Sequence, residues 1–296
     1  MIWPQRVWLC ALVVACSLAS AQTGEGGPPP SSPAPEYQTV FYNNGALRLE
    51  AYFYKPEGNG PFPLVVYNHG SRAGAERLER AMPFIARVLV PAGYAVLVPE
   101  RRGYGKSDGA PFSEEIGNDR GERFVRRLAA EAADVNAAVD YAKAQLPIDS
   151  QRIGVIGYSF GGIVTTLAAA RSKWFVAVVN QAPGALNWDR SPLLRQELLA
   201  SAEKITAPMV CMAAENDATT DNVRSICAKA RAHGGATEVI IYPPFKDARF
   251  DNPGAPGHAL FFYGVDIWRQ DVLTFLGKHM KPDGRPSDKA APASNP

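Results

Sequence analysis

The stretch that decides the fold is "VIGYSFGGI", residues 155–163, in which three glycines surround one serine. A run of β-branched residues leads into Gly157, and an apolar segment follows Ser159. The pattern G-x-S-x-G between a strand and a helix is typical of a nucleophile elbow, where a serine occupies a very tight turn. Glycine is expected at 157 and 161 because side chains there would collide with the neighbouring strand and helix. The stretch predicts a nucleophilic Ser159 at the tip of a sheet.

The alternative for this stretch is a packing turn or a phosphate-binding loop. A Walker-type loop needs Lys followed by Ser or Thr after its last glycine, and a dinucleotide fingerprint needs G-x-G-x-x-G; neither pattern is present. The start of the helix also supplies the N–H of Phe160, which can stabilise negative charge that develops beside Ser159. We therefore favour the elbow.

Strand and helix patterns alternate on both sides of this turn. Strands are predicted at 37–44, 47–56, 62–70, 94–100, 152–157, 175–181, 208–214 and 238–243, and helices at 76–90, 122–145, 222–232, 261–278 and after Ser159. The first two strands are expected to form an antiparallel hairpin around Asn44 and Gly45. Such alternation predicts an α/β fold, with a mostly parallel central sheet and helices on both faces. Ligand chemistry in such sheets gathers at the carboxyl ends of the strands.

The first residues have the pattern of an export signal. Arg6 precedes an apolar segment, and Ala19-Ser20-Ala21 fits cleavage before Gln22, so residues 1–21 are predicted to be a signal peptide. The apolar segment is shorter than a membrane span requires. "VVAC" at 13–16 also resembles a lipobox, which leaves open cleavage and a lipid anchor at Cys16. We expect an exported protein, periplasmic or secreted, with membrane anchoring as the alternative.

Three segments follow the signal peptide. Residues 22–36 are rich in Pro, Gly and Ser and predict an extended linker. Residues 37–280 are expected to form the α/β domain, and residues 281–296 a disordered tail. The chain of 296 residues is 46% apolar and carries a formal charge of +2 with both signs mixed, which argues against nucleic-acid and polybasic membrane partners.

Four cysteines are present, and two of them lie in the export segment. Cys211 falls in a predicted strand and Cys227 in the following helix. A disulfide between them is one interpretation in an oxidising compartment, but two buried, unpaired thiols is the one we favour. Neither has metal-ligand spacing, and we expect no metal and no cofactor.

Several motifs together resemble the α/β-hydrolase superfamily, and within it the dienelactone hydrolase-like branch. These are "NHGS" (68–71), "PERRGYGKSDG" (99–109), "IDSQRIGVIGYSFGG" (148–162), "AAENDATT" (213–220) and "PGHALF" (256–261). They cover the domain in the family's order. The founding members use a cysteine nucleophile, whereas position 159 is serine, which puts hydrolysis of lactone rings by that route in doubt.

A serine hydroxyl needs a base to take its proton. Of four histidines, His258 lies in the loop between the last strand and the last helix, where the superfamily places its base. His69 falls in the loop that the family uses for the oxyanion hole, His233 stands where a helix ends, and His279 lies near the tail. We therefore predict that His258 is the base.

The acid is expected on the loop between Ser159 and His258 in the chain. Asp217 follows a predicted strand and matches the family's aspartate. Glu215 and Asp221 are the rivals: the first is expected near the strand end and the second as the cap of the next helix. The predicted role of Asp217 is to hold His258 in the correct tautomer.

The oxyanion hole is predicted to combine the N–H groups of Phe160 and Ser71. Arg101 and Arg102 have two interpretations: they orient this loop or meet an anionic substrate, or they simply pair with surface carboxylates. We favour the purely structural one.

A short cap of about twenty residues is expected before the strand at 208–214. Its apolar residues either line a pocket or form the buried stripe of a packing helix; they are Trp188, Leu193, Leu194 and Leu198.

Three classes of function remain. The first is a serine esterase that acts on small or medium ester substrates through an acyl-enzyme. The second is a peptidase or amidase on the same scaffold, and the third is a binding module that has lost the chemistry.

Overall fold

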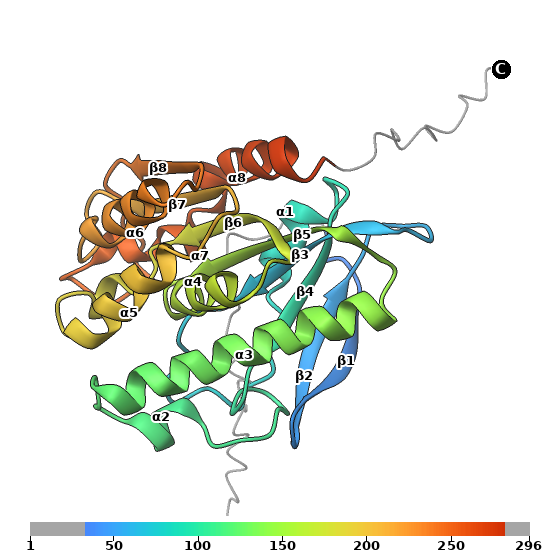
Figure 1. Cartoon of the computed structure of the whole chain (residues 1–296), viewed down its shortest axis with the longest axis horizontal. Coiled ribbons are helices and arrows are strands. Elements are labelled where there is room, and N and C mark those ends of the chain that lie inside the picture. Colours follow the sequence, from blue (N-terminus) through green and yellow to red (C-terminus); the bar gives the residue numbers. More distant parts are fainter. Residues whose placement is uncertain (1–32, 282–296) are drawn as a thin grey trace, which may run out of the picture.

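One eight-stranded sheet forms the centre of the computed structural model, which describes residues 33–281 (Figure 1). The strand order is β1-β2-β4-β3-β5-β6-β7-β8. β2 pairs antiparallel with β1 and with β4, and every other neighbouring pair is parallel. The strands are β1 Tyr37–Asn44, β2 Leu47–Tyr54, β3 Phe62–Asn68, β4 Ala95–Glu100, β5 Ile148–Tyr158, β6 Phe175–Gln181, β7 Met209–Ala214 and β8 Thr237–Tyr242. The predicted α/β class is confirmed.

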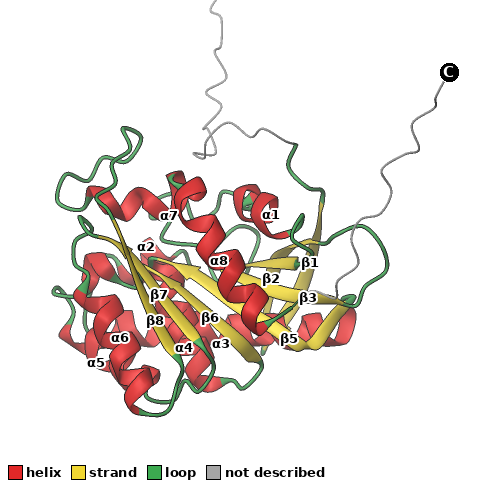
Figure 2. Ribbon diagram, turned by 90° about the horizontal axis from the view of Figure 1, so that it is seen from above, coloured by secondary structure: helices red, strands yellow, loops and turns green. Residues whose placement is uncertain are grey.

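Helices cover both faces of the sheet (Figure 2). They are α1 Pro83–Leu89, α2 Phe112–Ile116, α3 Glu122–Gln145, α4 Phe160–Arg171, α5 Pro192–Ala202, α6 Asp221–Ala232, α7 Leu260–Tyr263 and α8 Val265–His279, with short 3-10 turns at Ala185–Asn187 and Pro256–Ala259. Successive side chains of a strand point to opposite faces. In β3, Leu64 and Val66 therefore belong to the buried cluster that includes residues of α3, α4, α5 and α6, whereas Val65 and Tyr67 belong to the cluster that includes residues of α1, α7 and α8. Both faces are buried, which explains the near-continuous apolar strands.

The segment 76–90 is helical only from Pro83 onward, so the predicted helix is too long. Proline fits the first helical position because its missing N–H has no acceptor there. The polar residues before it bind another loop instead: Arg77 donates to the carbonyl of Ser107, and Glu76 accepts from the N–H of Ser113. These contacts hold the preceding residues as an irregular segment.

The last predicted helix is also divided. α7 and α8 meet at Gly264, which ends the first and precedes the second. By contrast, the predicted helix at 122–145 has the bounds of α3.

Cys211 and Cys227 form a disulfide, so our expectation of two unpaired thiols is wrong. The two Cα atoms are 6.4 Å apart because α6 packs on β7 with both cysteines facing each other in the same buried cluster. The bridge joins the strand before Asp217 to the helix after it.

Three predictions lie outside the described residues: the signal peptide 1–21, a lipid anchor at Cys16, and most of the linker and tail. Within residues 33–281, no helix combines the length and apolarity needed to cross a bilayer. In the same range, no group of three or more His, Cys, Asp or Glu side chains is gathered as metal ligands would be.

Candidate active site

Ser159 occupies the turn between β5 and α4 with φ +57° and ψ −115°. This left-handed conformation is costly for a residue with a Cβ and is retained only where neighbours impose it. The Ser159 N–H donates to the carbonyl of Gln181 at 2.9 Å, and the Ser159 carbonyl accepts from the N–H groups of Ile163 and Gly184 at 3.2 Å each. The backbone of Ser159 is therefore fixed on both sides.

The glycines around Ser159 are required by close backbone contacts. A Cβ at Gly161 would overlap the carbonyl oxygen of Asn68, and a Cβ at Gly157 would overlap the carbonyl group of Gly161. At Gly162 it would lie 2.8 Å from the Cα of Pro183. The predicted reason for glycine at 157 and 161 is confirmed.

Ser159, His258 and Asp217 lie in one hydrogen-bonded row. The Ser159 Oγ and the His258 Nε2 are 2.8 Å apart, and the His258 Nδ1 lies 3.0 Å from each carboxylate oxygen of Asp217. All three side chains are buried, with residue exposures of 7%, 2% and 8% in the order Ser, His, Asp. The structure brings together the three residues that the sequence analysis selected, from the segments that follow β5, β7 and β8.

The rival acids do not reach His258 in this arrangement. Glu215 directly follows β7, where its N–H donates to the carbonyl of Tyr242, and its side chain is exposed. Asp221 is exposed in the first turn of α6. The N-cap position belongs to Thr220, so the predicted capping role of Asp221 is wrong.

Asn216 and Gly257, which the sequence analysis missed, connect the loop that carries Asp217 to the segment that carries His258. The side chain of Asn216 bonds reciprocally to the backbone N–H and carbonyl of Phe245, both at 2.9 Å. Gly257 donates its N–H to the Asn216 carbonyl, and a Cβ at Gly257 would lie 2.8 Å from the Asp217 nitrogen. In the sequence, the one signal that could have indicated this close contact is Gly257, directly before His258.

Tyr158 also contacts His258, through both its hydroxyl and its ring. Its hydroxyl donates to the His258 carbonyl at 2.8 Å, and the two rings are 5.2 Å apart. Burial, and then the charge of Asp217, raise the pKa of the Tyr158 hydroxyl well above its usual value. The hydroxyl is therefore a neutral, permanent donor.

The segment 69–71, where the sequence analysis expects one donor of an oxyanion hole, lies beside Ser159, and we call it the oxyanion loop. It follows β3, and a Cβ at Gly70 would lie 3.4 Å from the Ser159 Cβ. Ser71 is exposed at the end of this loop, and Phe160, directly after Ser159, is the first residue of α4. N–H groups of the first helical turn have no acceptor within the helix, which leaves that of Phe160 available.

Arg101 and Arg102 pair with buried carboxylates, not surface ones. Arg102 donates twice to Asp134, whose side chain is fully buried. Arg101 is itself fully buried, donating its Nε to Glu131 at 2.8 Å and its Nη2 to the His69 carbonyl at 3.1 Å. Of our two interpretations, contact with the oxyanion loop therefore applies to Arg101, and a purely structural pair to Arg102.

His69 is buried within the oxyanion loop, and its ring contacts that of Tyr104 at 4.8 Å. Burial and the charges of Arg101 and Arg72 hold the pKa of the His69 imidazole well below its usual value. Burial raises the pKa of the neighbouring Glu100 to about 7, although Arg72 donates to both of its oxygens. The side chains packed against the oxyanion loop are therefore polar and buried.

The other histidines lie apart from this row. His233 ends α6, where its Nδ1 lies 2.9 Å from the Lys229 carbonyl, and His279 ends α8. In the cap, Trp188, Leu194 and Leu198 are buried in the core cluster, whereas Leu193 is 44% exposed. The buried-stripe interpretation therefore holds for Leu194 and Leu198 on α5, whereas Trp188 is buried in the turn before this helix.

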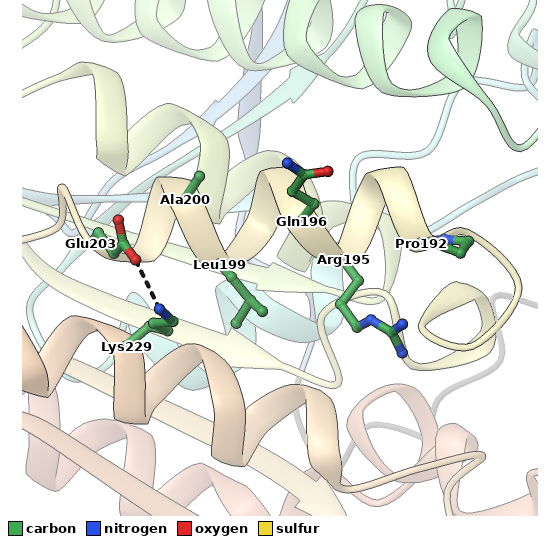
Figure 3. A pocket seen from close by; sticks show the side chains of 7 residues that line it. All are labelled: Pro192, Arg195, Gln196, Leu199, Ala200, Glu203 and Lys229. Carbon is green, nitrogen blue, oxygen red and sulfur yellow. Dashed lines mark hydrogen bonds and ion pairs between the residues drawn. The ribbon is translucent and has the colours of Figure 1, made fainter.

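A shallow groove of about 430 Å³ lies on the surface of α5 and α6 (Figure 3). A pair between Lys229 Nζ and Glu203 Oε1 at 2.9 Å crosses it. The lining residues are Pro192, Arg195, Gln196, Leu199, Ala200, Glu203 and Lys229, none of which belongs to the hydrogen-bonded row.

The fold and the elbow together define the class: this is an α/β-hydrolase. A family model described as X-Pro dipeptidyl-peptidase (S15 family) matches residues 44–237. The chain belongs to this family. The matched region contains Ser159 and Asp217 and ends before His258.

Individual curated proteins and solved structures are also similar to this chain. The quorum-quenching protein AidA of Acinetobacter baumannii is 31% identical over 49% of this chain and 43% of its own length. A Methylorubrum extorquens protein assigned as a carboxymethylenebutenolidase is 27% identical over 66% of each chain, in agreement with the dienelactone hydrolase-like branch. The chain thus spans less than two thirds of either curated relative. The structure of the Pyrococcus furiosus esterase Pf2001 has the same fold, with 22% identity, a TM-score of 0.60, and 83% of this chain and 93% of that chain covered.

Proposed function

We propose that this protein is an exported serine hydrolase that cleaves carboxylic esters of small or medium substrates through Ser159, His258 and Asp217. The observation that carries the proposal is the 2.8 Å contact between Ser159 Oγ and His258 Nε2, with Asp217 at the other ring nitrogen. A serine on a strained elbow with a base in hydrogen-bond range is the arrangement that nucleophilic catalysis requires. An intact row also argues against a binding module that has lost its chemistry.

The first half of the reaction forms an acyl-enzyme. His258 Nε2 takes the proton of Ser159 as Oγ attacks the ester carbonyl carbon, and the carbonyl oxygen becomes an oxyanion. The N–H groups of Phe160 and Ser71 stabilise this charge. The intermediate collapses when the C–O bond to the leaving group breaks, and the proton on His258 passes to the departing alcohol.

The second half releases the acid. A water molecule gives a proton to His258 Nε2 and attacks the acyl carbon, and the oxyanion forms again at the same position. Its collapse returns the proton to Ser159 and frees the carboxylic acid. Asp217 stabilises the imidazolium in both halves and stays ionised throughout.

A peptidase is the second candidate, because the family model that matches this chain is described by a dipeptidyl-peptidase activity. An amine leaving group must be protonated during collapse, and peptidases position the leaving nitrogen through extended contacts with the peptide. In the described residues, the segment between β6 and β7 packs into the core through Trp188, Leu194 and Leu198. Because these side chains are buried, they cannot contact a bound peptide, so we favour the esterase.

We therefore expect short-chain aryl or alkyl esters to be hydrolysed more than a hundred-fold faster, in kcat/KM, than amides with the same acyl group. This corresponds to about 3 kcal/mol of transition-state discrimination. The measurement is a matched series of ester and amide pairs with the purified protein. A phenolate leaves with little assistance once Ser159 has attacked. An alcohol leaves with the proton from His258, whereas an amine must be protonated more fully and earlier before its bond to carbon breaks.

Two outcomes would contradict the esterase. Equal kcat/KM for ester and amide would favour the peptidase. No turnover of either, with Ser159 unlabelled by a fluorophosphonate, would favour the non-catalytic module.

Export is the remaining part of the proposal, and the disulfide supports it, since structural disulfides persist mainly in oxidising compartments. After expression in a bacterium, we expect mass spectrometry to find the mature N-terminus at Gln22, or at an acylated Cys16 if the protein is a lipoprotein. Soluble cytoplasmic protein that retains Met1 would overturn the export proposal.

A further inference from the structure

The oxyanion loop is held by buried side chains that contact its backbone or flank it. Arg101 follows β4 and is fully buried, yet its guanidinium donates to the carbonyl of His69, the first residue of the loop, at 3.1 Å. Its Nε donates to Glu131 of α3 at 2.8 Å. Arg127 also donates to Glu131, at 3.1 Å, so the carboxylate has its own support.

A second contact fixes the next peptide of the loop. His69 Nδ1 lies 2.8 Å from the Gly70 carbonyl, and since a carbonyl oxygen only accepts, Nδ1 carries the proton. In a trans peptide the C=O and the following N–H point in opposite directions. Holding the Gly70 carbonyl on the His69 side therefore directs the Ser71 N–H away from that ring.

The end of the loop is anchored as well. The residue after Ser71 is Arg72, which pairs with the buried Glu100. The Ser71 N–H thus lies between two charged anchors, Arg101 before it and Arg72 after it. Stabilisation of an oxyanion depends on donors that are oriented before the charge develops.

We propose that Arg101, held by Glu131, is a positioning residue that orients the oxyanion loop through the carbonyl of His69. This inference rests on the proposed function, because the loop matters only if an oxyanion forms beside Ser159. Arg101 touches no reacting atom, and its effect is expected in the transition state and not in substrate binding.

The first test compares Arg101→Lys with Arg102→Lys. Both variants keep the charge beside a buried carboxylate, but only Arg101 contacts the oxyanion loop. A lysine lacks the planar guanidinium group with which Arg101 reaches both Glu131 and the His69 carbonyl. We expect Arg101→Lys to lower kcat about 10- to 100-fold with KM within about 3-fold, and Arg102→Lys to stay within about 3-fold of the wild-type kcat.

A second readout separates positioning from stability. An aryl boronic acid forms a tetrahedral adduct with the nucleophilic serine, and its affinity should fall in Arg101→Lys in proportion to kcat/KM. Both measurements are made well below the melting temperature. Unchanged kcat and boronate affinity in folded Arg101→Lys, or an equal loss in Arg102→Lys, would overturn the proposal.

The double variant Arg101→Gln/Glu131→Gln removes both charges together and avoids leaving one buried charge unpaired. It should show the same loss of kcat. If both Arg101 variants fail to fold while Arg102→Lys folds, Arg101 is a stability residue and the positioning role is overturned. A wild-type protein without ester turnover would instead overturn the proposed function, and this role with it.

Discussion

Replacing Ser159 with alanine is expected to lower kcat by about a million-fold while the protein stays folded. The hydroxyl supplies the attacking oxygen, and among the described residues the structure places no other hydroxyl at hydrogen-bond distance from the ring nitrogens of His258. Alanine keeps the Cβ, so the left-handed backbone at position 159 costs the same as in the wild type. The measurement is steady-state ester hydrolysis, with circular dichroism and thermal melting to verify the fold.

Ser71→Ala is the matched control. The oxyanion loop contributes a backbone N–H at this position, so loss of the exposed hydroxyl should leave kcat within about 3-fold of the wild type. A fluorophosphonate should label the wild type and Ser71→Ala but not Ser159→Ala. A Ser159→Ala protein with a tenth of the wild-type activity would exclude Ser159 as the nucleophile.

The elbow could be predicted because its determinants are local. Three glycines and a serine within six residues specify a turn that few other sequences can adopt, and the structure shows the backbone contacts that exclude a Cβ at Gly157 and Gly161. The positions of Asp217 and His258 followed from chain order, since each lies in the loop after a late strand. Geometry then brought both residues to Ser159 because parallel strands end at one edge of the sheet.

The disulfide could not be decided in the same way. The pattern placed Cys211 on a strand and Cys227 on a helix, but it did not specify which face of each element the cysteines occupy. They meet because α6 packs on the face of β7 to which Cys211 points. Such a contact depends on tertiary packing, which local patterns do not contain.

The buried arginines have a similar explanation. Arginine is usually exposed, so Arg101 and Arg102 were expected to pair at the surface. In the structure α3 crosses the end of β4 and supplies Glu131 and Asp134 at the level of these two residues. The carboxylates that permit burial lie about thirty residues away in the chain, beyond the range of any local motif.

Replacing Asp217 with asparagine is expected to lower kcat by about ten thousand-fold without changing KM appreciably. The Asp217 Oδ1 accepts a hydrogen bond from the Ala218 N–H at 2.6 Å. In the variant the amide oxygen keeps this bond, which turns the amide NH₂ toward His258 Nδ1. That nitrogen must then be the acceptor, so the proton moves to Nε2, where it faces Ser159 and prevents the histidine from acting as a base.

The controls for this last prediction are two exposed carboxylates near Asp217 in the chain: Glu215, which directly follows β7, and Asp221, which begins α6. Glu215→Gln and Asp221→Asn should each stay within about 3-fold of the wild-type kcat, because neither contacts His258 in the structure. Asp217→Glu, which stays ionised but lengthens the side chain, should recover part of the activity that asparagine removes. If Asp217→Asn instead stays within ten-fold of the wild type, or if either control is equally damaging, another group holds the histidine. The 3.0 Å contacts between Asp217 and His258 would then have a structural role only.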